Sequence, residues 1–341
     1  MSNCDEGLVK AGDRPGIFEH SEYLDKRYSF LDRYVQIAYK GFWTPAKYEK
    51  LIKEVDVPYF NNILPAVDKE AIKRCILAVA MVEDKVKMFW PYLYQDIPQT
   101  VISDVGGLHG MIEITHRRSY HSLAEQIGVN IKDIDNHPVL RDRLEYLNKH
   151  LEKDPKIIGK KRVLKKLVLF TSLVEKGSLF TQFYILMSYA KNNRGLKTIS
   201  ALQQSTAAEE NSHYAFGIDL INIIKEEYPS LWEEYLIELV SKNIQMAYDT
   251  ELRLIDWFFE QGVPEHLTKE EVVNFLGYNF NTICKDLELK IRFDYDDELY
   301  REKNEWMMLK LHSTEPDFFD NAVGGYSSDD EEVNLDEFDF N

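Results

Sequence analysis

Cysteine is scarce in this chain of 341 residues: only Cys4, Cys75 and Cys284 are present, and they lie far apart. No Cys-x-x-Cys pair or Cys/His cluster has the spacing of a zinc site. An odd number of separated cysteines in a chain of this size is typical of a reducing compartment. We therefore expect a cytoplasmic protein without a disulfide framework.

Long apolar runs and an excess of basic charge are also lacking. No run reaches the ~18 residues that a membrane helix needs, and the first residues lack the apolar segment of a signal peptide. The net charge of −17 argues against a general nucleic-acid binder. No P-loop or glycine-rich fingerprint is present. We expect a soluble protein that binds no membrane, nucleic acid or nucleotide.

Proline and glycine are few, at 11 and 16 residues, and long helical patterns dominate. Strand alternation is nowhere convincing, so we expect an all-α protein. Residues 1–28 are interpreted as a lead-in, 29–312 as one helical domain and 313–341 as a flexible acidic tail. Residues 97–107 are interpreted as a connector. The predicted helices are 69–92, ended by Pro91, then 108–127, a short helix to about 153, 162–192, 197–227, 230–261 and 268–291.

One short motif, Glu-x-x-His, occurs twice within apolar helical pattern. It comprises Glu113 and His116, and again Glu210 and His213. Residues three apart are neighbours on one face of a helix, so each pair can offer an oxygen and a nitrogen to one cation. A single such motif is common by chance, whereas two in separate long helices favour a di-metal bundle, which needs one further carboxylate from each of two other helices.

Two buried carboxylates complete that set. The apolar stripe of helix 69–92 passes through position 83, so Glu83 is preferred to Asp84, which is rotated about 100° away. Glu175 lies in a segment with no other charge than Lys176 between Lys166 and Lys191. Burying it unpaired is unfavourable, so either a metal ion or a buried ion pair must compensate it, and we favour the metal.

The six groups are four carboxylates and two imidazoles, a ligand set that suits iron or manganese better than structural zinc. Four carboxylates approximately balance two divalent ions. Tyr120 lies four residues after His116 and seven after Glu113, on the same helix face, just beyond the first metal ligands. Taken alone it would be a core tyrosine whose hydroxyl is bonded to a carboxylate.

In this order (Glu83, "EITHRRSY", Glu175 in "VEKGSLFTQFY", then "EENSH") the sequence resembles the radical-generating small subunit of class I ribonucleotide reductase. The resemblance runs from about Tyr34 to the C-terminus. It implies a ferritin-like bundle with two metal ions, iron or else manganese, activated by an oxygen species. It also implies a stable radical on Tyr120, which Phe180, Phe183 and Tyr184 would shield.

The resemblance assigns roles to three further places. In "GFWTP", Trp43 would lead from the metal site to the surface, although a core tryptophan is an equal interpretation. Glu209 occupies the position of the acid that links that tryptophan to a metal-bound histidine. In the tail, Tyr326 would relay the radical. Phe338 and Phe340 would dock on the large catalytic subunit, which reduces ribonucleotides.

The tail can also be interpreted from composition. From Tyr326 to Asn341 it holds seven acids and no base, too acidic and too poor in apolar groups to fold alone. Its two phenylalanines favour a segment that orders on a partner over a purely solubilising tail. A homodimer and an activating flavoprotein are further implications of the resemblance.

Three departures from the family pattern leave the metal open. Glu83 and Glu209 stand where many members have Asp, and the stretch from Glu175 to Glu210 is one residue longer than usual. The alternatives are a di-iron oxygenase or ligand-binding oxidase on the same bundle, a ferritin-like storage protein, and a non-enzymatic bundle. The oxidase would share the six ligands but would not need Trp43, Tyr326 or the tail.

Overall fold

The computed structural model describes residues 16–20, 27–86, 88–130, 132 and 137–312, and every regular element within them is helical. The all-α prediction is therefore confirmed. No helix in this part of the chain combines the length and apolar character needed to cross a bilayer. The predicted boundaries at residues 28 and 312 stay predictions.

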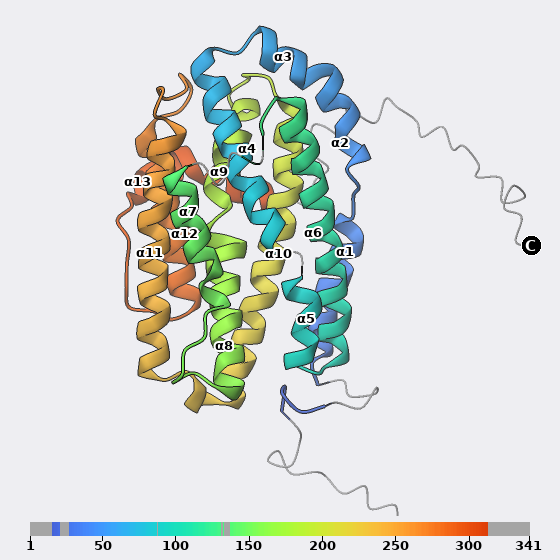
Figure 1. The fold of residues 1–341 in the computed structure, drawn as a ribbon, viewed down its shortest axis with the longest axis vertical. Helices are drawn as coiled ribbons and strands as arrows, with labels where there is room; N and C mark the ends of the chain where they lie inside the picture. The colour runs from blue at the N-terminus through green and yellow to red at the C-terminus, as the bar shows by residue number, and fades with distance from the viewer. Residues whose placement is uncertain (1–15, 21–26, 87, 131, 133–136, 313–341) are drawn as a thin grey trace, which may run out of the picture. The chain divides into compact units, whose positions relative to one another are not determined.

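Long helices running side by side carry the centre of the fold (Figure 1). They are α4 (Ala66–Val86), α6 (Thr100–Gln126), α10 (Lys197–Glu227) and the pair α8 (Gly159–Leu169) and α9 (Phe180–Lys191). Helix α4 packs on α6 and α9, and α10 packs on α8 and α9. Because apolar side chains fill the space between these helices, any polar group that points inward is removed from water.

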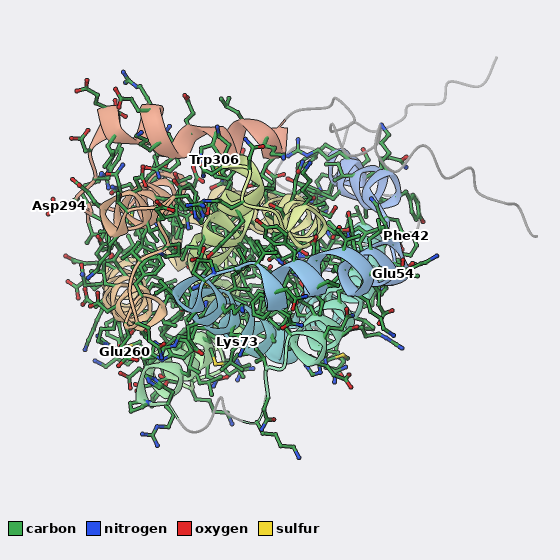
Figure 2. The ribbon with its side chains drawn as sticks, turned by 90° about the horizontal axis from the view of Figure 1, so that it is seen from above. Phe42, Glu54, Lys73, Glu260, Asp294 and Trp306 are labelled. Atoms are coloured by element: carbon green, nitrogen blue, oxygen red, sulfur yellow. The ribbon has the colours of Figure 1, made fainter. Side chains whose placement is uncertain are left out.

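The remaining helices cover this centre. Helices α1 (Asp32–Gly41) and α5 (Phe89–Asp96) pack on α6, and α11 (Glu234–Phe258) packs on α4, α7 (Pro138–Leu147) and α12 (Lys269–Asp286). The short helices are α2 (Ala46–Leu51), α3 (Val57–Asn62), α13 (Asp297–Leu299) and α14 (Glu305–His312). Seen from above in Figure 2, the exposed charged side chains of Glu54, Glu260 and Asp294 lie at the periphery of this arrangement.

The prediction that Pro91 ends the first long helix is wrong. Helix α4 ends at Val86, and Pro91 lies in the first turn of a separate helix, α5, which begins at Phe89. A proline is tolerated in the first helical turn because the backbone N–H groups there have no partner within the helix. Pro91 therefore lies near the start of α5 and does not mark the end of α4.

The connector predicted at 97–107 is also mostly wrong, because α6 begins at Thr100. The glycine pair Gly106–Gly107 suggested a break, but both residues are helical. A Cβ atom added to Gly106 would lie 2.5 Å from the backbone oxygen of Trp90 in α5. Gly106 thus allows α5 and α6 to approach closely rather than interrupting α6.

The segment predicted as one helix over 162–192 is divided. After α8 the backbone widens into a π-helical stretch, Phe170–Gly177, and α9 starts only at Phe180. By contrast, the helix predicted at 197–227 coincides with α10. Helix α12 begins one residue after the predicted start, with a capping box between Thr268 and Glu271, but ends at Asp286, before the predicted end at 291.

Candidate metal centre

All six predicted ligands point into the space between the central helices. Each is at most 1 % exposed, although each is polar or charged. They come from four separate segments: α4, α6, the π-helical stretch and α10. The six residues are Glu83 on α4, Glu113 and His116 on α6, Glu175 in the π-helical stretch, and Glu210 and His213 on α10.

Their ligand atoms form two overlapping groups of four, within which all atoms lie within 4.8 Å of one another. The first group is Glu83, Glu113, His116 and Glu210. The second is Glu113, Glu175, Glu210 and His213. Because Glu113 and Glu210 belong to both groups, the arrangement can hold two cations side by side with two shared carboxylates, as a dinuclear site requires.

Both imidazoles turn the same nitrogen toward the carboxylates. The Nδ1 atom of His116 lies 2.9 Å from Glu210 Oε1. The Nδ1 atom of His213 lies 3.1 Å from Glu113 Oε1 and 3.2 Å from Glu210 Oε2. Within each motif the same Nδ1 atom faces the carboxylate three residues earlier, at 3.9 Å in the pair Glu113–His116 and at 3.2 Å in the pair Glu210–His213.

The carboxylates are strongly perturbed. Burial raises the pKa of Glu83, Glu113 and Glu175, and the negative charge of Glu210 raises it further. Both oxygens of Glu83 and of Glu113 have no hydrogen-bond partner within the described part of the chain. Buried carboxylates normally have partners. Cations would satisfy these oxygens, so the donor set fits a pair of metal ions.

The pKa values of the two histidines are also raised, but for a different reason. Burial alone would lower the pKa of His116, but hydrogen bonds with Glu209 and Glu210 raise it well above its ordinary value. At His213 the negative charge of Glu210 and the nearby carboxylate of Glu113 also outweigh burial and raise its pKa. Protonated imidazoles therefore compensate carboxylate charge where metal ions would otherwise do so.

Glu175 is not compensated by a lysine. The neighbouring Lys176 points away, with its Nζ atom 3.2 Å from Asn211 Oδ1 and 3.8 Å from the centroid of the Phe180 ring. No ion pair with an arginine or lysine reaches Glu175 among the described residues. The cationic group that approaches Glu175 is instead the His213 imidazole, whose Nδ1 atom lies 3.6 Å from Glu175 Oε2.

A second set of predicted residues forms a continuous link to one histidine. The indole nitrogen of Trp43 donates to Glu209 Oε2 at 2.8 Å, and the same oxygen lies 2.7 Å from His116 Nε2. The rings of Trp43 and His116 are nearly parallel, with centroids 6.0 Å apart. Trp43 is thus connected to the metal-ligand cluster through one carboxylate.

Tyr120 is fully buried on α6, one helical turn beyond His116. Its hydroxyl donates to Gln203 Oε1 on α10 at 2.7 Å, a partner that the sequence did not predict. Of the residues expected to shield it, Phe180 and Phe183 are buried on α9. Tyr184 instead stacks on Phe275 and donates to the backbone oxygen of Lys303.

Two further side chains at the site, Trp90 and His109, were not predicted from the sequence. Trp90 on α5 donates its indole N–H to Glu175 Oε1 at 2.6 Å. The His109 ring lies 4.0 Å from that of His213 between centroids. His109 stands four residues before Glu113, so helical spacing could have found it. Trp90 could not be found that way, because it reaches the site from a different helix.

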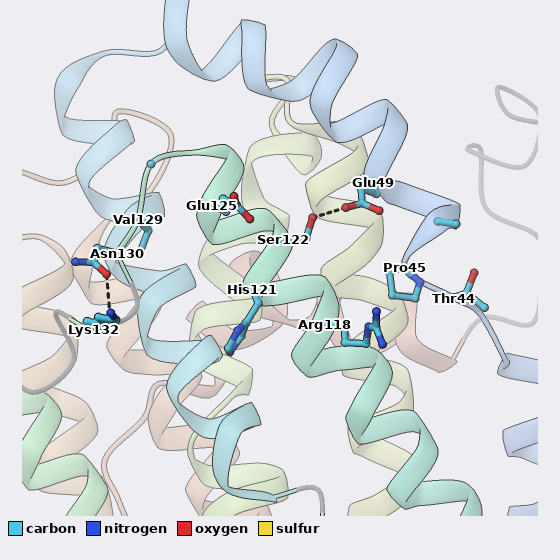
Figure 3. Close-up of a pocket in the computed structure, with 12 residues that line it drawn as sticks. Thr44, Pro45, Glu49, Arg118, His121, Ser122, Glu125, Val129, Asn130 and Lys132 are labelled. Atoms are coloured by element: carbon cyan, nitrogen blue, oxygen red, sulfur yellow. Dashed lines mark hydrogen bonds between the residues drawn. The ribbon is translucent and has the colours of Figure 1, made fainter.

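A cavity of about 300 Å³ leads from exposed residues of α1 to the same site. Its inner wall includes His109, Glu209 and His213. A larger cleft of about 910 Å³ lies on another face of α6 and is lined by residues such as Arg118 and Glu125 (Figure 3). The larger cleft contains none of the predicted site residues.

The predicted tail residues Tyr326, Phe338 and Phe340 lie outside the described residues. Asp84, the rejected alternative to Glu83, lies on α4, but its side chain is also outside them. The structure therefore brings together nine predicted residues, which are the six ligands, Tyr120, Trp43 and Glu209.

Comparison with known proteins identifies a family that matches this chain. The model of the ribonucleotide reductase small-chain family matches residues 22–333. Over 173 residues the chain is 32% identical to ribonucleoside-diphosphate reductase subunit beta of Chlamydia pneumoniae. That alignment covers 50% of this chain and 47% of the relative, so the chain spans about half the length of the curated relative it matches.

Solved structures share the fold at low identity. A candidate class I ribonucleotide reductase of Bacillus halodurans has a TM-score of 0.71 and 17% identity, over 83% of this chain and 100% of that one. Dimanganese(II) NrdF of Streptococcus sanguinis has a TM-score of 0.68 and 15% identity, over 86% and 99%. At this identity the likenesses support the helical fold alone.

Proposed function

The chain belongs to the family of ribonucleotide reductase small chains, and we propose from this that it is the radical-generating subunit of a ribonucleoside-diphosphate reductase. The large catalytic subunit would carry out the reduction of ribonucleotides to deoxyribonucleotides. The observation that carries the proposal is the continuous contact from the carboxylate–histidine cluster through Glu209 to Trp43. An oxidase or a storage protein has no need of such a link.

Two metal ions, iron or else manganese, are the proposed cofactors. Glu83 and His116 would belong to one ion, Glu175 and His213 to the other, and Glu113 and Glu210 to both. When bound, such a centre supplies an oxidising equivalent obtained from an oxygen species. The related fold from Streptococcus sanguinis is a dimanganese protein, so both metals need testing.

Tyr120 is proposed to store that equivalent as a radical. Full burial keeps the phenol away from water and external reductants. Burial also raises the pKa of Tyr120 well above its ordinary value, and the charge of Glu83 adds to this, so the resting side chain is a neutral phenol. Oxidation then removes one electron and the phenol proton together.

Transfer to the partner would use Trp43 and Glu209, and then Tyr326 in the tail. Phe338 and Phe340 are proposed to anchor the tail on the large subunit. A double variant, Phe338→Ala with Phe340→Ala, should bind the large subunit more weakly while keeping the same Tyr120 radical. Unchanged affinity in a pull-down titration would argue against this role.

A homodimer, an activating flavoprotein and a cytoplasmic location complete the proposal. The dimer and the flavoprotein rest on family membership. The location rests on the scarce cysteines, of which Cys75 and Cys284 are free and buried. Sedimentation, co-purification from the source cells and cell fractionation test the three in turn.

Electron paramagnetic resonance tests the central proposal. Protein loaded with ferrous iron, or with manganese, is exposed to air or to a superoxide source, and the bound metal is quantified. We expect about two metal ions per chain and a tyrosyl doublet that is absent from Tyr120→Phe. Tyr189→Phe, which alters another buried tyrosine, is the matched control and should keep the doublet.

Two outcomes would change the assignment. Two metals per chain with no doublet under any loading would indicate an oxidant that stays on the metals, or the oxygenase and oxidase alternative. A doublet that survives in Tyr120→Phe would assign the radical to a different tyrosine.

A further inference from the structure

The oxygen of Tyr120 lies in polar rather than apolar surroundings. Its hydroxyl donates to Gln203 Oε1 at 2.7 Å. Thr206, three residues later on α10, is a second polar side chain near the phenol: it lowers the pKa of Tyr120 against the larger effect of burial, although its Oγ1 has no hydrogen-bond partner among the described residues. Tyr120, Gln203 and Thr206 are all fully buried.

The other end of the Gln203 amide is unused. Its Nε2 atom has no hydrogen-bond partner among the described residues, although it is buried. A buried N–H group without a partner is unfavourable and rare, so it needs an explanation. A side-chain amide has an acceptor oxygen and a donor nitrogen of similar size, and a half-turn about its last torsion exchanges them.

We propose that Gln203 is the positioning residue of Tyr120, accepting a hydrogen bond from the reduced phenol and, after rotation of its amide, donating one from Nε2 to the oxygen of the Tyr120 radical. This inference rests on the proposed function of Tyr120. It explains why a buried polar side chain with a spare donor stands beside the Tyr120 hydroxyl.

The exchange follows from the balance of the oxidation. Tyr120–OH would become Tyr120–O• by losing its phenol proton and one electron, and the metal pair that the six carboxylate and histidine ligands would hold supplies the oxidising equivalent. An amide oxygen is too weak a base to hold the released proton, so the proton would have to leave toward a carboxylate, and the charge of Glu83 is near enough to raise the pKa of Tyr120. The radical oxygen has no hydrogen left to donate, so only a donor can bond to it.

The contact with the reduced phenol is measured first, in metal-free protein. Tyrosine labelled with ¹³C at Cζ reports hydrogen bonding of each phenol by NMR, and the Tyr120 signal is the one missing from Tyr120→Phe. Gln203→Met keeps the volume of the side chain but removes both polar atoms. We expect the Tyr120 signal to shift in Gln203→Met and to stay in place in Gln182→Met, which removes another fully buried glutamine.

The contact with the radical is measured by high-field electron paramagnetic resonance of the metal-loaded, oxidised protein. A donated hydrogen bond lowers the largest g value of a tyrosyl radical. We expect that g value to rise in Gln203→Met, and an exchangeable deuteron coupling seen in wild type in D₂O to disappear. Thr206→Val, which removes only the neighbouring hydroxyl, should change neither.

Each contrary result rejects a definite part of the inference. An unmoved NMR signal in Gln203→Met would reject the acceptor role. A wild-type radical with no coupled deuteron would reject the donor role, even if the variant fails to fold. Effects confined to Thr206→Val would assign the donor to Thr206. A wild type with no radical at all would reject the proposed function and the donor role together, whereas the NMR result would still decide the acceptor role.

Discussion

Burying four carboxylates in one apolar space is the most unfavourable feature of this protein at the scale of single residues. An unpaired buried carboxylate is strongly disfavoured, and removing one partner of a buried charged network typically costs about 3–5 kcal/mol. Here burial, and then the neighbouring carboxylates, raise the pKa of Glu83 and Glu175, and both oxygens of Glu83 lack a hydrogen-bond partner in the described part of the chain. Such residues persist in a fold only where a cation or a proton compensates them.

Substitution of Trp90 tests whether its hydrogen bond to Glu175 supports metal binding at that carboxylate. Trp90→Phe keeps an aromatic ring in place but removes the N–H group that bonds to Glu175. Loss of a hydrogen bond to a ligating carboxylate lowers metal affinity by roughly 10- to 100-fold. In Trp90→Phe we expect the ion held by Glu175 and His213 to lose affinity within that range, measured by a competition titration with a chelator.

Trp257→Phe is the matched control for this substitution. Trp257 lies on α11, and its ring packs against His137 and Phe258 rather than against the metal ligands. Equal metal affinities for the two variants would contradict a supporting role of Trp90.

At the scale of elements, the local departures from regular helix are what bring the ligands together. Glu175 lies within a π-helical stretch, and such widened turns occur frequently at functional sites. Helix α5 brings Trp90 to Glu175, and its close approach to α6 depends on Gly106. A bundle of regular helices with ordinary spacing would not have this contact.

Two adjacent glycines of α6 provide a test of that close approach. In Gly106→Ala the new Cβ atom would meet the Trp90 backbone oxygen at 2.5 Å, whereas in Gly107→Ala nothing lies within 4 Å. Overpacking costs about 1–3 kcal/mol, and alanine in an open helical position gains about 1 kcal/mol over glycine. Urea unfolding should therefore show Gly106→Ala destabilised and Gly107→Ala stabilised; equal changes would refute the close approach.

At the scale of the whole molecule, metal binding, proton binding and folding are linked. In the metal-free protein the pKa values of Glu83 and Glu175 are raised above the ordinary 4.5, and those of His116 and His213 above the ordinary 6.5. Groups with a raised pKa in the folded state stabilise it fully below their ordinary pKa. That stabilisation is lost as the pH rises through the folded pKa. The lowered pKa of Glu210 acts in the opposite sense, but only as the pH falls below 4.5.

This linkage predicts a divergence between two forms of the protein. From about pH 6 to about pH 8 the metal-free protein should lose stability, whereas the loaded protein gains, because metal ions bind the deprotonated ligands more tightly as protons leave. At metal concentrations 100-fold above the dissociation constant, each bound ion adds about 2.7 kcal/mol to the stability of the loaded protein. Calorimetric unfolding with and without a chelator measures it, and a difference that shrinks with rising pH would contradict the linkage.

The amino-acid sequence by itself determined the parts of this protein that depend on spacing along one helix. Glu113 and His116, and likewise Glu210 and His213, must share a face wherever the chain is helical, and Tyr120 must follow on the same face. The long helices follow from the same periodicity, as the agreement at 197–227 illustrates. Where proline or glycine was taken as a stop, at Pro91 and at Gly106, the prediction failed because tertiary contacts decide whether those residues end a helix.

Only the tertiary structure decided which residues from other segments meet this face. Trp90 reaches Glu175, Gln203 receives the hydroxyl of Tyr120, and Lys176 points away from the carboxylates, although it is adjacent to Glu175 in sequence. Each of these contacts depends on how the helices pack and rotate against one another. A local sequence pattern carries no information about that packing. The two Glu-x-x-His pairs could therefore be predicted from periodicity, whereas the groups that contact the proposed ligands from other segments are set by packing.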